Sequence, residues 1–325
     1  MKKKKIILIH NTKAQWIDND IKILSNDYIV ESYFINSISD YSFHLLQKIY
    51  LSEIVYFWFG SLIFFPATIL AKCMLKKVCI VAGGYDVASY KEEKYGAFTF
   101  SKLSKFLRIM LFKLADLVLP VSQFTAEEAK KNARVPTEKI EVVHNCVAIF
   151  PQLEVLRKPK ILMVSSIDLL RCRIKGFDRF LEVVDMLPQT QFTHVGAISY
   201  EVLSKISKRS NLTLLGNISA KQLQEVYASH KVIVQFSRYE SFCMSIVEGA
   251  LQGCFPVSSD DGALGEIVKP IGKSFEFEKV ETVSEFLKDI MQSEINHQSI
   301  REKTLSTYGY EQRRKQLLNA LRAHF

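Results

Sequence analysis

Short apolar runs alternate with amphipathic segments of helical length along the whole chain, and this alternation is the feature that most constrains its fold. The runs that we expect to form strands are Lys5–Ile9, Ile29–Phe34, Val55–Phe59, Val78–Ala82, Leu117–Val121, Ile140–His144, Lys160–Val164, Gln191–Val195, Leu212–Leu215, Val232–Phe236 and Phe255–Ser258. Amphipathic segments between them include 101–114, Asp178–Met186, Ala220–Ser229 and Ser241–Gln252. Strands that alternate with helices form right-handed βαβ units, so the pattern predicts parallel sheets covered by helices.

The alternation restarts near Pro159, which predicts two domains. A chain of 325 residues is long enough for two cores, at roughly 100–200 residues per domain. Residues 149–159 contain two prolines and are expected to form the linker. The predicted architecture is α/β, with two doubly wound Rossmann-like domains, 1–150 and 151–307, whose parallel sheets face a central cleft.

One segment, Ile54–Ala71, has the length of a membrane-spanning helix and no formal charge. Gly60, Ser61 and Pro66 interrupt it, and its first residues are aromatic or β-branched. This composition favours a buried strand, a turn and a buried helix.

The formal net charge is +9, and residues 1–150 hold 20 basic against 14 acidic residues. An excess of this kind indicates a polyanionic partner: a nucleic acid, an anionic membrane or a phosphorylated substrate. The sequence contains no RNP pattern, zinc finger or helix-turn-helix pattern, so we do not expect nucleic acid.

The six cysteines are scattered and form no metal-ligand spacing, which predicts reduced thiols in a cytoplasmic protein and no metal site. They are Cys73, Cys79, Cys146, Cys172, Cys243 and Cys254.

The segment 101–114 is a basic amphipathic helix. Lys102, Lys105, Arg108 and Lys113 fall on one arc, and Leu103, Phe106, Leu107, Met110 and Leu114 fall on the other. We expect the apolar arc to pack on the sheet and the basic arc to face solvent. The alternative is a helix that lies on an anionic membrane surface.

The residues most typical of a functional site follow the predicted strand that ends at Phe236. We expect a turn over 237–240 and a helix that begins near Ser241, whose free backbone N–H groups would favour an anion such as a diphosphate. Glu240 and Glu248 are separated by eight residues, or roughly 12 Å of helix. That is too far for one proton-transfer site, so they would contact different hydroxyl groups of one elongated ligand. The alternative is two solvated glutamates.

This stretch resembles the Glu-x7-Glu signature of retaining GT-B fold glycosyltransferases of glycosyltransferase family four. The matching positions are Glu240, Glu248, Gly249, Ala250, Gly253, Pro256 and Val257. Further segments similar to the family follow in the expected order over about residues 78–268, namely 116–122, 142–145, 161–165, 175–176, 215–219 and 232–237.

The resemblance implies a UDP- or GDP-sugar donor held by the second domain. Glu248 matches the residue that binds the ribose hydroxyls, Glu240 lies near the donor sugar, and Lys175 neutralises the diphosphate. The backbone amides of Ser241, Phe242 and Cys243 would face sugar or phosphate. No cofactor or metal is expected, since Lys175 would supply the positive charge that the diphosphate needs.

The chain departs from the family pattern at several positions. The family pairs its lysine with an arginine five residues earlier, where this chain has Leu170, so we expect Arg171 rather than Arg173 to substitute. The glycine-rich turn after the first strand is replaced by residues 10–13, and no residue is identified as the catalytic base.

The family's histidine after the fourth strand is also absent, and Gly83 takes its place. Gly83 and Gly84 would let a ligand approach the backbone closely. Asp86 would either contact ligand hydroxyls or form an Asx-turn.

By this resemblance the protein is expected to be a retaining, metal-independent glycosyltransferase that acts on a saccharide or lipid-linked hydroxyl acceptor in polysaccharide, lipopolysaccharide or glycolipid assembly. It would be cytoplasmic, with peripheral contact on the inner face of an anionic membrane. The first domain would bind the acceptor, and the amphipathic helix 308–325 would cross back onto it. The alternative is a non-catalytic GT-B scaffold or partner of an active transferase.

Overall fold

The computed structural model describes residues 3–147, 153, 155–276 and 280–325. The chain divides into two compact units: unit 1 is Met1–Ala148 together with Tyr310–Phe325, and unit 2 is Ile149–Gly309. Five of the eleven residues of the expected linker, 149–152 and 154, fall outside the described residues, and its last two residues, Lys158 and Pro159, already belong to a strand.

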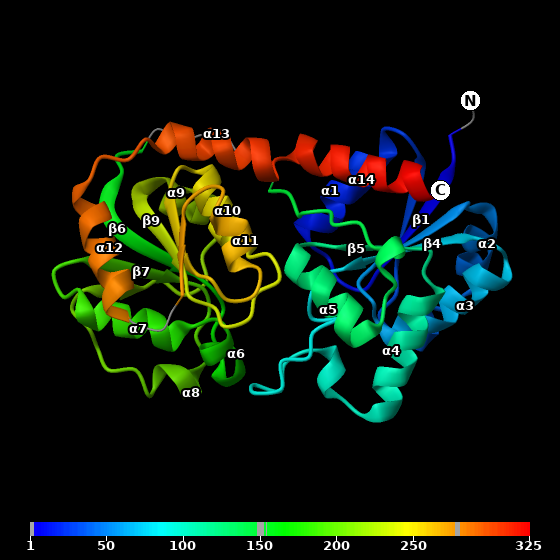
Figure 1. Ribbon diagram of the computed structural model, residues 1–325, viewed down its shortest axis with the longest axis horizontal. Coiled ribbons are helices and arrows are strands. Elements are labelled where there is room, and N and C mark those ends of the chain that lie inside the picture. The colour runs from blue at the N-terminus through cyan, green and yellow to red at the C-terminus, as the bar shows by residue number, and fades with distance from the viewer. Residues whose placement is uncertain (1–2, 148–152, 154, 277–279) are drawn as a thin grey trace. The chain divides into compact units, whose positions relative to one another are not determined.

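Unit 1 is built on a five-stranded parallel sheet in the order β2-β1-β3-β4-β5 (Figure 1). The strands are β1 Lys5–His10, β2 Ile29–Phe34, β3 Ile54–Trp58, β4 Lys77–Ala82 and β5 Leu117–Pro120. The helices are α1 Gln15–Ser25, α2 Phe43–Leu51, α3 Phe65–Cys73, α4 Lys102–Leu114, α5 Gln123–Ala133 and α14 Tyr310–His324. The central strands are almost wholly buried, as a sheet covered on both faces requires.

The uncharged segment 54–71 forms β3, a single 3-10 turn over Leu62–Phe64 and α3, so the predicted strand, turn and helix are confirmed. Pro66 lies in the first turn of α3, where its missing N–H leaves no hydrogen bond unmade. Within the described part of the chain, no helix combines the length and apolar character needed to cross a membrane.

The strand predicted at Ile140–His144 is wrong. Ile140 makes one isolated bridge to Val118, and the residues after it run as extended chain. The carbonyl oxygens of Val143 and His144 accept hydrogen bonds from Arg313 of α14, at 3.1 and 2.7 Å. These carbonyls are therefore satisfied by a side chain instead of a neighbouring strand.

The last helix starts later than predicted. Tyr308 ends α13 in unit 2, and α14 begins at Tyr310, after Gly309. A fully buried ion pair holds α14 in unit 1, with Arg313 Nε 2.6 Å from Asp20 Oδ1. Tyr56 and Trp58 also donate hydrogen bonds to the Asp20 carboxylate.

Unit 2 is built on a six-stranded parallel sheet in the order β11-β10-β9-β6-β7-β8. The strands are β6 Lys158–Val164, β7 Gln191–Val195, β8 Leu212–Leu214, β9 His230–Gln235, β10 Phe255–Ser259 and β11 Lys273–Phe275. The helices are α6 Leu169–Ile174, α7 Phe177–Met186, α8 Tyr200–Leu203, α9 Ala220–Ser229, α10 Met244–Leu251, α11 Leu264–Val268, α12 Val280–Gln292 and α13 His297–Tyr308. Two Rossmann-like α/β units with parallel sheets confirm the predicted fold class.

The strand order locates a switch point in each sheet. In unit 2 the chain runs outward from β6 to β8, returns to the other side of β6, and runs outward again from β9 to β11. The corresponding point in unit 1 lies between β1 and β3. Open α/β sheets bind ligands at the carboxyl ends of the strands beside such a point, which directs attention to the segments after β6 and β9.

Candidate functional site

An ion pair joins the segments that follow β6 and β9. Lys175 Nζ lies 2.6 Å from Glu240 Oε2, although 65 residues separate them in sequence. The two side chains are 30% and 12% exposed, so the pair is accessible without being fully solvated. Ser237 Oγ is 3.4 Å from the same carboxylate oxygen. The structure thus brings two predicted site residues together at the switch point of unit 2.

Gly176 allows the Lys175 segment to lie directly against the end of β9. Its φ is +65°, and a Cβ there would stand 1.8 Å from the carbonyl oxygen of Phe236. The carbonyl of Lys175 accepts a hydrogen bond from the Gln235 side chain at 3.0 Å. The Lys-Gly pair is therefore required by close backbone contact as well as by its charge.

The segment before α10 differs from the prediction. The helix begins at Met244, and Cys243 occupies the N-cap in the left-handed region, with φ 69°. Ser241, Phe242 and Cys243 therefore precede the helix, and the 12 Å estimate between the glutamates no longer applies. The N–H of Ser241 donates to Glu240 Oε1 at 3.3 Å, so one of the three predicted amides faces a carboxylate in this structure.

The side chains of the other two residues are buried. The Phe242 ring packs edge-on against Tyr308, with ring centroids 5.5 Å apart. Burial raises the pKa of the Cys243 thiol to about 12, which keeps it neutral and unreactive near neutral pH. These side chains pack inside unit 2, and the contact of the Phe242 and Cys243 backbone amides with sugar or phosphate stays a prediction.

Glu248 lies on α10, where it is partly buried. Its Oε2 accepts a hydrogen bond from the Tyr227 hydroxyl of α9 at 3.1 Å. Burial raises the pKa of this carboxyl to about 7, against the lowering effect of the Tyr227 bond. The next residue, Gly249, places the helix close to β9, since a Cβ there would lie 2.6 Å from Ile233 Cδ1.

The segment after β10 also contacts Glu240. Ala263 N–H donates to the Glu240 carbonyl at 2.8 Å, and Gly262 has φ +61° with no room for a Cβ beside the same residue. Asp261 pairs with Arg179 of α7 at 2.5 Å. Three adjacent strands, β6, β9 and β10, therefore converge on Glu240.

Tyr227, Gln235, Ser237 and Asp261 are site residues that the sequence analysis missed. Each belongs to an ordinary helix, strand or turn pattern, and its role follows from contacts with residues distant in sequence. Besides the Glu-x7-Glu pattern, the glycines at 176 and 262, which lie in turns after predicted strands, mark the region in the sequence.

The predicted loop before Lys175 is the short helix α6, capped by Asp168, whose carboxylate accepts from Arg171 N–H at 2.7 Å. Arg171 precedes Lys175 by four residues, so the two share one face of the helix end. Its guanidinium lies 3.7 Å from Asp168. Arg173 lies two residues from Lys175, a spacing that does not place the two on one face.

In unit 1, the space beside Gly83 is filled. A Cβ on Gly83 would lie 2.1 Å from the ring of Phe59, so a glycine is needed here to accommodate that aromatic side chain. The approach of a ligand to the backbone of Gly83 and Gly84 stays a prediction. Asp86 is buried and accepts backbone hydrogen bonds from Gly60 at 2.7 Å and Gly84 at 2.9 Å. Asp86 thus joins the loops after β3 and β4, and neither bond is that of an Asx-turn, in which the side chain accepts from the residue two positions later. Its contact with ligand hydroxyls stays a prediction.

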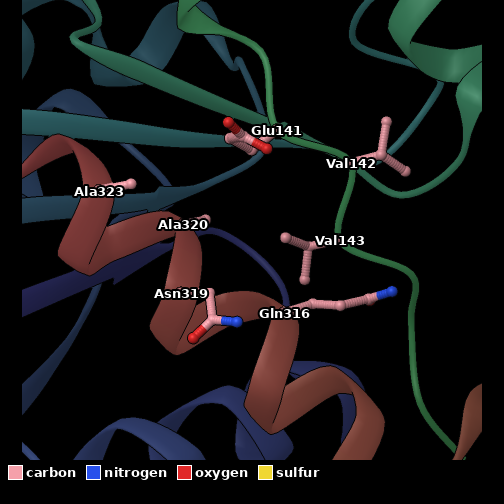
Figure 2. A pocket seen from close by; sticks show the side chains of 7 residues that line it. All are labelled: Glu141, Val142, Val143, Gln316, Asn319, Ala320 and Ala323. Carbon is pink, nitrogen blue, oxygen red and sulfur yellow. The ribbon is translucent and has the colours of Figure 1, made fainter.

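A hollow of about 310 Å³ lies between α14 and residues 141–143, which follow α5 and a 3-10 turn. Figure 2 shows Gln316, Asn319, Ala320 and Ala323 on the helix side, and Glu141, Val142 and Val143 on the other. Its lining is mainly aliphatic and amide, and its one charged residue is acidic, so a phosphate group would find no cation there.

Among the residues that the structure describes, no three His, Cys, Asp or Glu side chains are grouped to hold a metal ion. The charged centre of the unit 2 site is the ammonium of Lys175.

The two Rossmann-like units define the GT-B fold. The second unit carries a candidate anion site at the carboxyl edge of its sheet. Residues 148–311, about half the chain, match the family described as glycosyl transferases group 1, and the chain belongs to that family. The match covers the unit that contains Lys175, Glu240 and Glu248.

Known proteins resemble the chain at low identity. An uncharacterized 41.2 kDa protein in the cps region of Klebsiella pneumoniae is 26% identical over 202 residues, which is 57% of this chain and 55% of that protein. The match therefore spans about half the length of that relative.

Two solved structures share the fold over nearly the whole chain. The apo form of the lipopolysaccharide outer core galactosyltransferase WaaB is 16% identical, with a TM-score of 0.71 over 99% of this chain and 100% of that one. Anabaena Alr3699/HepE, in complex with UDP and glucose, is 15% identical, with a TM-score of 0.74 over 98% and 100%.

Proposed function

We propose that this chain is a retaining glycosyltransferase that moves a sugar from a UDP- or GDP-sugar to a hydroxyl acceptor without a metal ion. The observation that carries the proposal is the Lys175–Glu240 ion pair at the switch point of unit 2, with Glu248 on the adjoining helix. Membership of a glycosyltransferase family supports it. A fold shared with a protein solved in complex with UDP and glucose agrees with the choice of donor.

In this proposal Lys175 stabilises the leaving group. When the bond between the sugar and the diphosphate breaks, negative charge develops on the phosphate oxygens, and a fixed cation lowers the energy of that transition state. Arg171, on the same face of the helix end, adds a second cation. The diphosphate would replace Glu240 as the partner of the ammonium group, which releases the glutamate to accept hydrogen bonds from donor-sugar hydroxyls.

Glu248 would hold the nucleotide by its ribose. Two ribose hydroxyls donate hydrogen bonds best to an ionised carboxylate, and bonds to a charged acceptor are about twice as strong as neutral ones. The hydrogen bond from Tyr227 fixes one carboxylate oxygen and leaves the other available. The raised pKa of Glu248 then makes nucleotide binding sensitive to pH near 7.

The proposed reaction transfers the sugar with retained configuration. The acceptor oxygen bonds to the anomeric carbon on the face from which the diphosphate departs, and the acceptor proton passes to a leaving phosphate oxygen. We assign the acceptor to unit 1 and to the saccharides or lipid-linked saccharides of polysaccharide, lipopolysaccharide or glycolipid assembly. The relative from a cps region and the structural likeness to a lipopolysaccharide galactosyltransferase support that class.

The test combines nucleotide binding with donor turnover. Calorimetry with UDP and GDP, and hydrolysis of a panel of UDP- and GDP-sugars, are measured on the wild type, Glu248→Gln and Lys175→Met. The matched controls are Glu225→Gln, at an exposed position on α9, and Arg209→Met, at a residue that precedes β8 and pairs with Asp185 of α7.

We expect one nucleotide to bind, Glu248→Gln to weaken it at least tenfold (about 1.4 kcal/mol), and both controls to match the wild type. Absence of binding to every nucleotide, or equal binding by Glu248→Gln, would refute the donor site. Nucleotide binding without turnover of any donor would favour the non-catalytic scaffold.

A further inference from the structure

The first half of α4 leaves its apolar face uncovered. Leu103 and Phe106 are 67% and 58% exposed, and Phe100, just before the helix, is 54% exposed. Residues three apart lie on one helix face, so Leu103 and Phe106 form a single apolar surface. The predicted apolar arc is not the buried face of α4, so that prediction is wrong: the buried residues, Leu111 and Phe112, lie outside the arc. Arg108 of the predicted basic arc is half-buried instead and donates a hydrogen bond to the Gly60 carbonyl at 3.2 Å.

Basic side chains border this apolar surface. Residues 91–114 contain six basic and two acidic residues. Three of the lysines, with two phenylalanines and a threonine, line a hollow of about 460 Å³. The lining residues are Lys91, Lys94, Phe98, Thr99, Phe100 and Lys105. Ammonium groups around a hollow beside exposed apolar side chains suit the phosphate of a lipid headgroup whose acyl chains lie alongside.

The hollow is part of an ordered loop. Tyr90 and Tyr95 exchange backbone hydrogen bonds of 2.9 Å in both directions, and Phe98 N–H donates to the Ala88 carbonyl at 2.9 Å. Gly96, at φ +104°, brings the returning backbone so close to Ala88 that a Cβ on Gly96 would lie 2.3 Å from the Ala88 carbonyl oxygen. Figure 1 shows this segment and α4, in cyan to teal, outside the sheet of unit 1.

We propose that this surface, defined by Lys91, Lys94, Phe100, Lys102, Leu103, Lys105 and Phe106, docks unit 1 on an anionic lipid bilayer. Leu103 and Phe106 enter the headgroup region, and the lysines contact lipid phosphates. A bilayer is favoured over a protein partner by the charge pattern. A second exposed apolar area on α2, with Phe43 and Tyr50 at 80% and 65% exposure, carries fewer cations: Lys76 lies over the Tyr50 ring, 5.5 Å from its centroid, and Lys48 pairs with Glu31.

The proposal goes beyond the transferase activity and does not depend on it. The test is co-sedimentation of the full chain with vesicles of phosphatidylcholine alone or with about 30% phosphatidylglycerol, in about 0.1 M salt. The variants are Leu103→Ser with Phe106→Ser, and Lys102→Ala with Lys105→Ala. The apolar control is Phe43→Ser with Tyr50→Ser, and the basic control is Lys205→Ala with Lys208→Ala, an exposed pair in unit 2.

The wild type should bind the anionic vesicles and not the neutral ones, and binding should weaken as salt rises. Each test variant should bind about tenfold or more weakly, since each lysine near an anionic surface contributes roughly fivefold. Both controls should bind like the wild type. Failure of the wild type to bind, equal binding by the test variants, or equal losses in the controls would overturn the proposal.

A direct measurement of membrane insertion separates a specific loss of binding from misfolding of a variant. In the Phe106→Trp variant, brominated lipid in anionic vesicles should quench the fluorescence of the new tryptophan. The total quenching should exceed that of the wild type, whose signal comes from Trp16 and Trp58 alone. Quenching equal to that of the wild type would contradict insertion. Donor hydrolysis measured in parallel separates the two proposals, because Leu103→Ser with Phe106→Ser should retain it and Glu248→Gln should retain vesicle binding.

Discussion

Replacing Glu248 with glutamine tests whether this carboxyl group lowers the free energy of unfolding when it is ionised. Its pKa is about 7 in the folded chain, against an ordinary value of 4.5. Between these two values the folded state keeps a proton that the unfolded chain has lost. The contribution of Glu248 to stability therefore falls as pH rises through this window and is constant above it. Glutamine cannot ionise, so the variant should not show this loss.

The size of the effect follows from the two pKa values. Linkage gives a loss of about 2.5 kcal/mol between about pH 5 and pH 8.5. Because the side chain is only partly buried and solvent reduces the penalty, we expect about 1–2.5 kcal/mol. The Glu248→Gln variant should therefore gain that amount relative to the wild type across this range.

The measurement is urea unfolding of the full chain at several pH values. Both tryptophans, Trp16 and Trp58, lie in unit 1, so their fluorescence follows that unit while circular dichroism follows both. Glu225→Gln, exposed on α9, is the control and should show no pH-dependent difference. Two results would refute a buried carboxyl group that retains its proton. One is a stability difference between Glu248→Gln and the wild type that does not change with pH, and the other is a wild type that is the more stable protein at high pH.

Further predictions concern the ion pair, the backbone and the last helix. Lys175→Met should lower kcat/KM for the preferred donor by about 10²–10³-fold, and a loss no larger than that of Arg209→Met would contradict its role. Gly176→Ala should lower the free energy of unfolding by about 2 kcal/mol or more in urea titrations, since φ is +65° and the Phe236 carbonyl oxygen fills the Cβ position. Arg313→Met should lose about 3–5 kcal/mol by leaving Asp20 buried without its cation, which tryptophan fluorescence would follow. Asp20→Asn with Arg313→Met should recover part of that loss, and full additivity would show that the pair is not coupled. Donor turnover should be unchanged by EDTA, and loss of turnover restored by a divalent metal would contradict a metal-independent site.

Local patterns in the sequence were enough to predict most of the elements. Ten of the eleven predicted strands are present, and α9 has the predicted bounds, Ala220–Ser229. Capping and periodicity act within a few residues, so they can be recognised without the fold: Ser219, for example, makes a capping box with Gln222. The same local information identified Lys175, Glu240 and Glu248 as candidates, together with a resemblance that named their roles.

The sequence could not reveal what depends on contacts between distant segments. The left-handed turn at Cys243 delays α10 to Met244, and Arg313 takes the carbonyls that a sixth strand in unit 1 would have used. The space at Gly83 is filled by Phe59, which no pattern around residue 83 records.

The periodicity of the chain by itself determined two parallel α/β units, because burial of alternating apolar segments leaves few other arrangements. Only the tertiary structure decided that Lys175 meets Glu240 and that the apolar face of α4 is uncovered at Leu103 and Phe106. The reason is physical: periodicity gives each segment a face to bury, but the order of strands in the sheet decides which faces and loop ends meet.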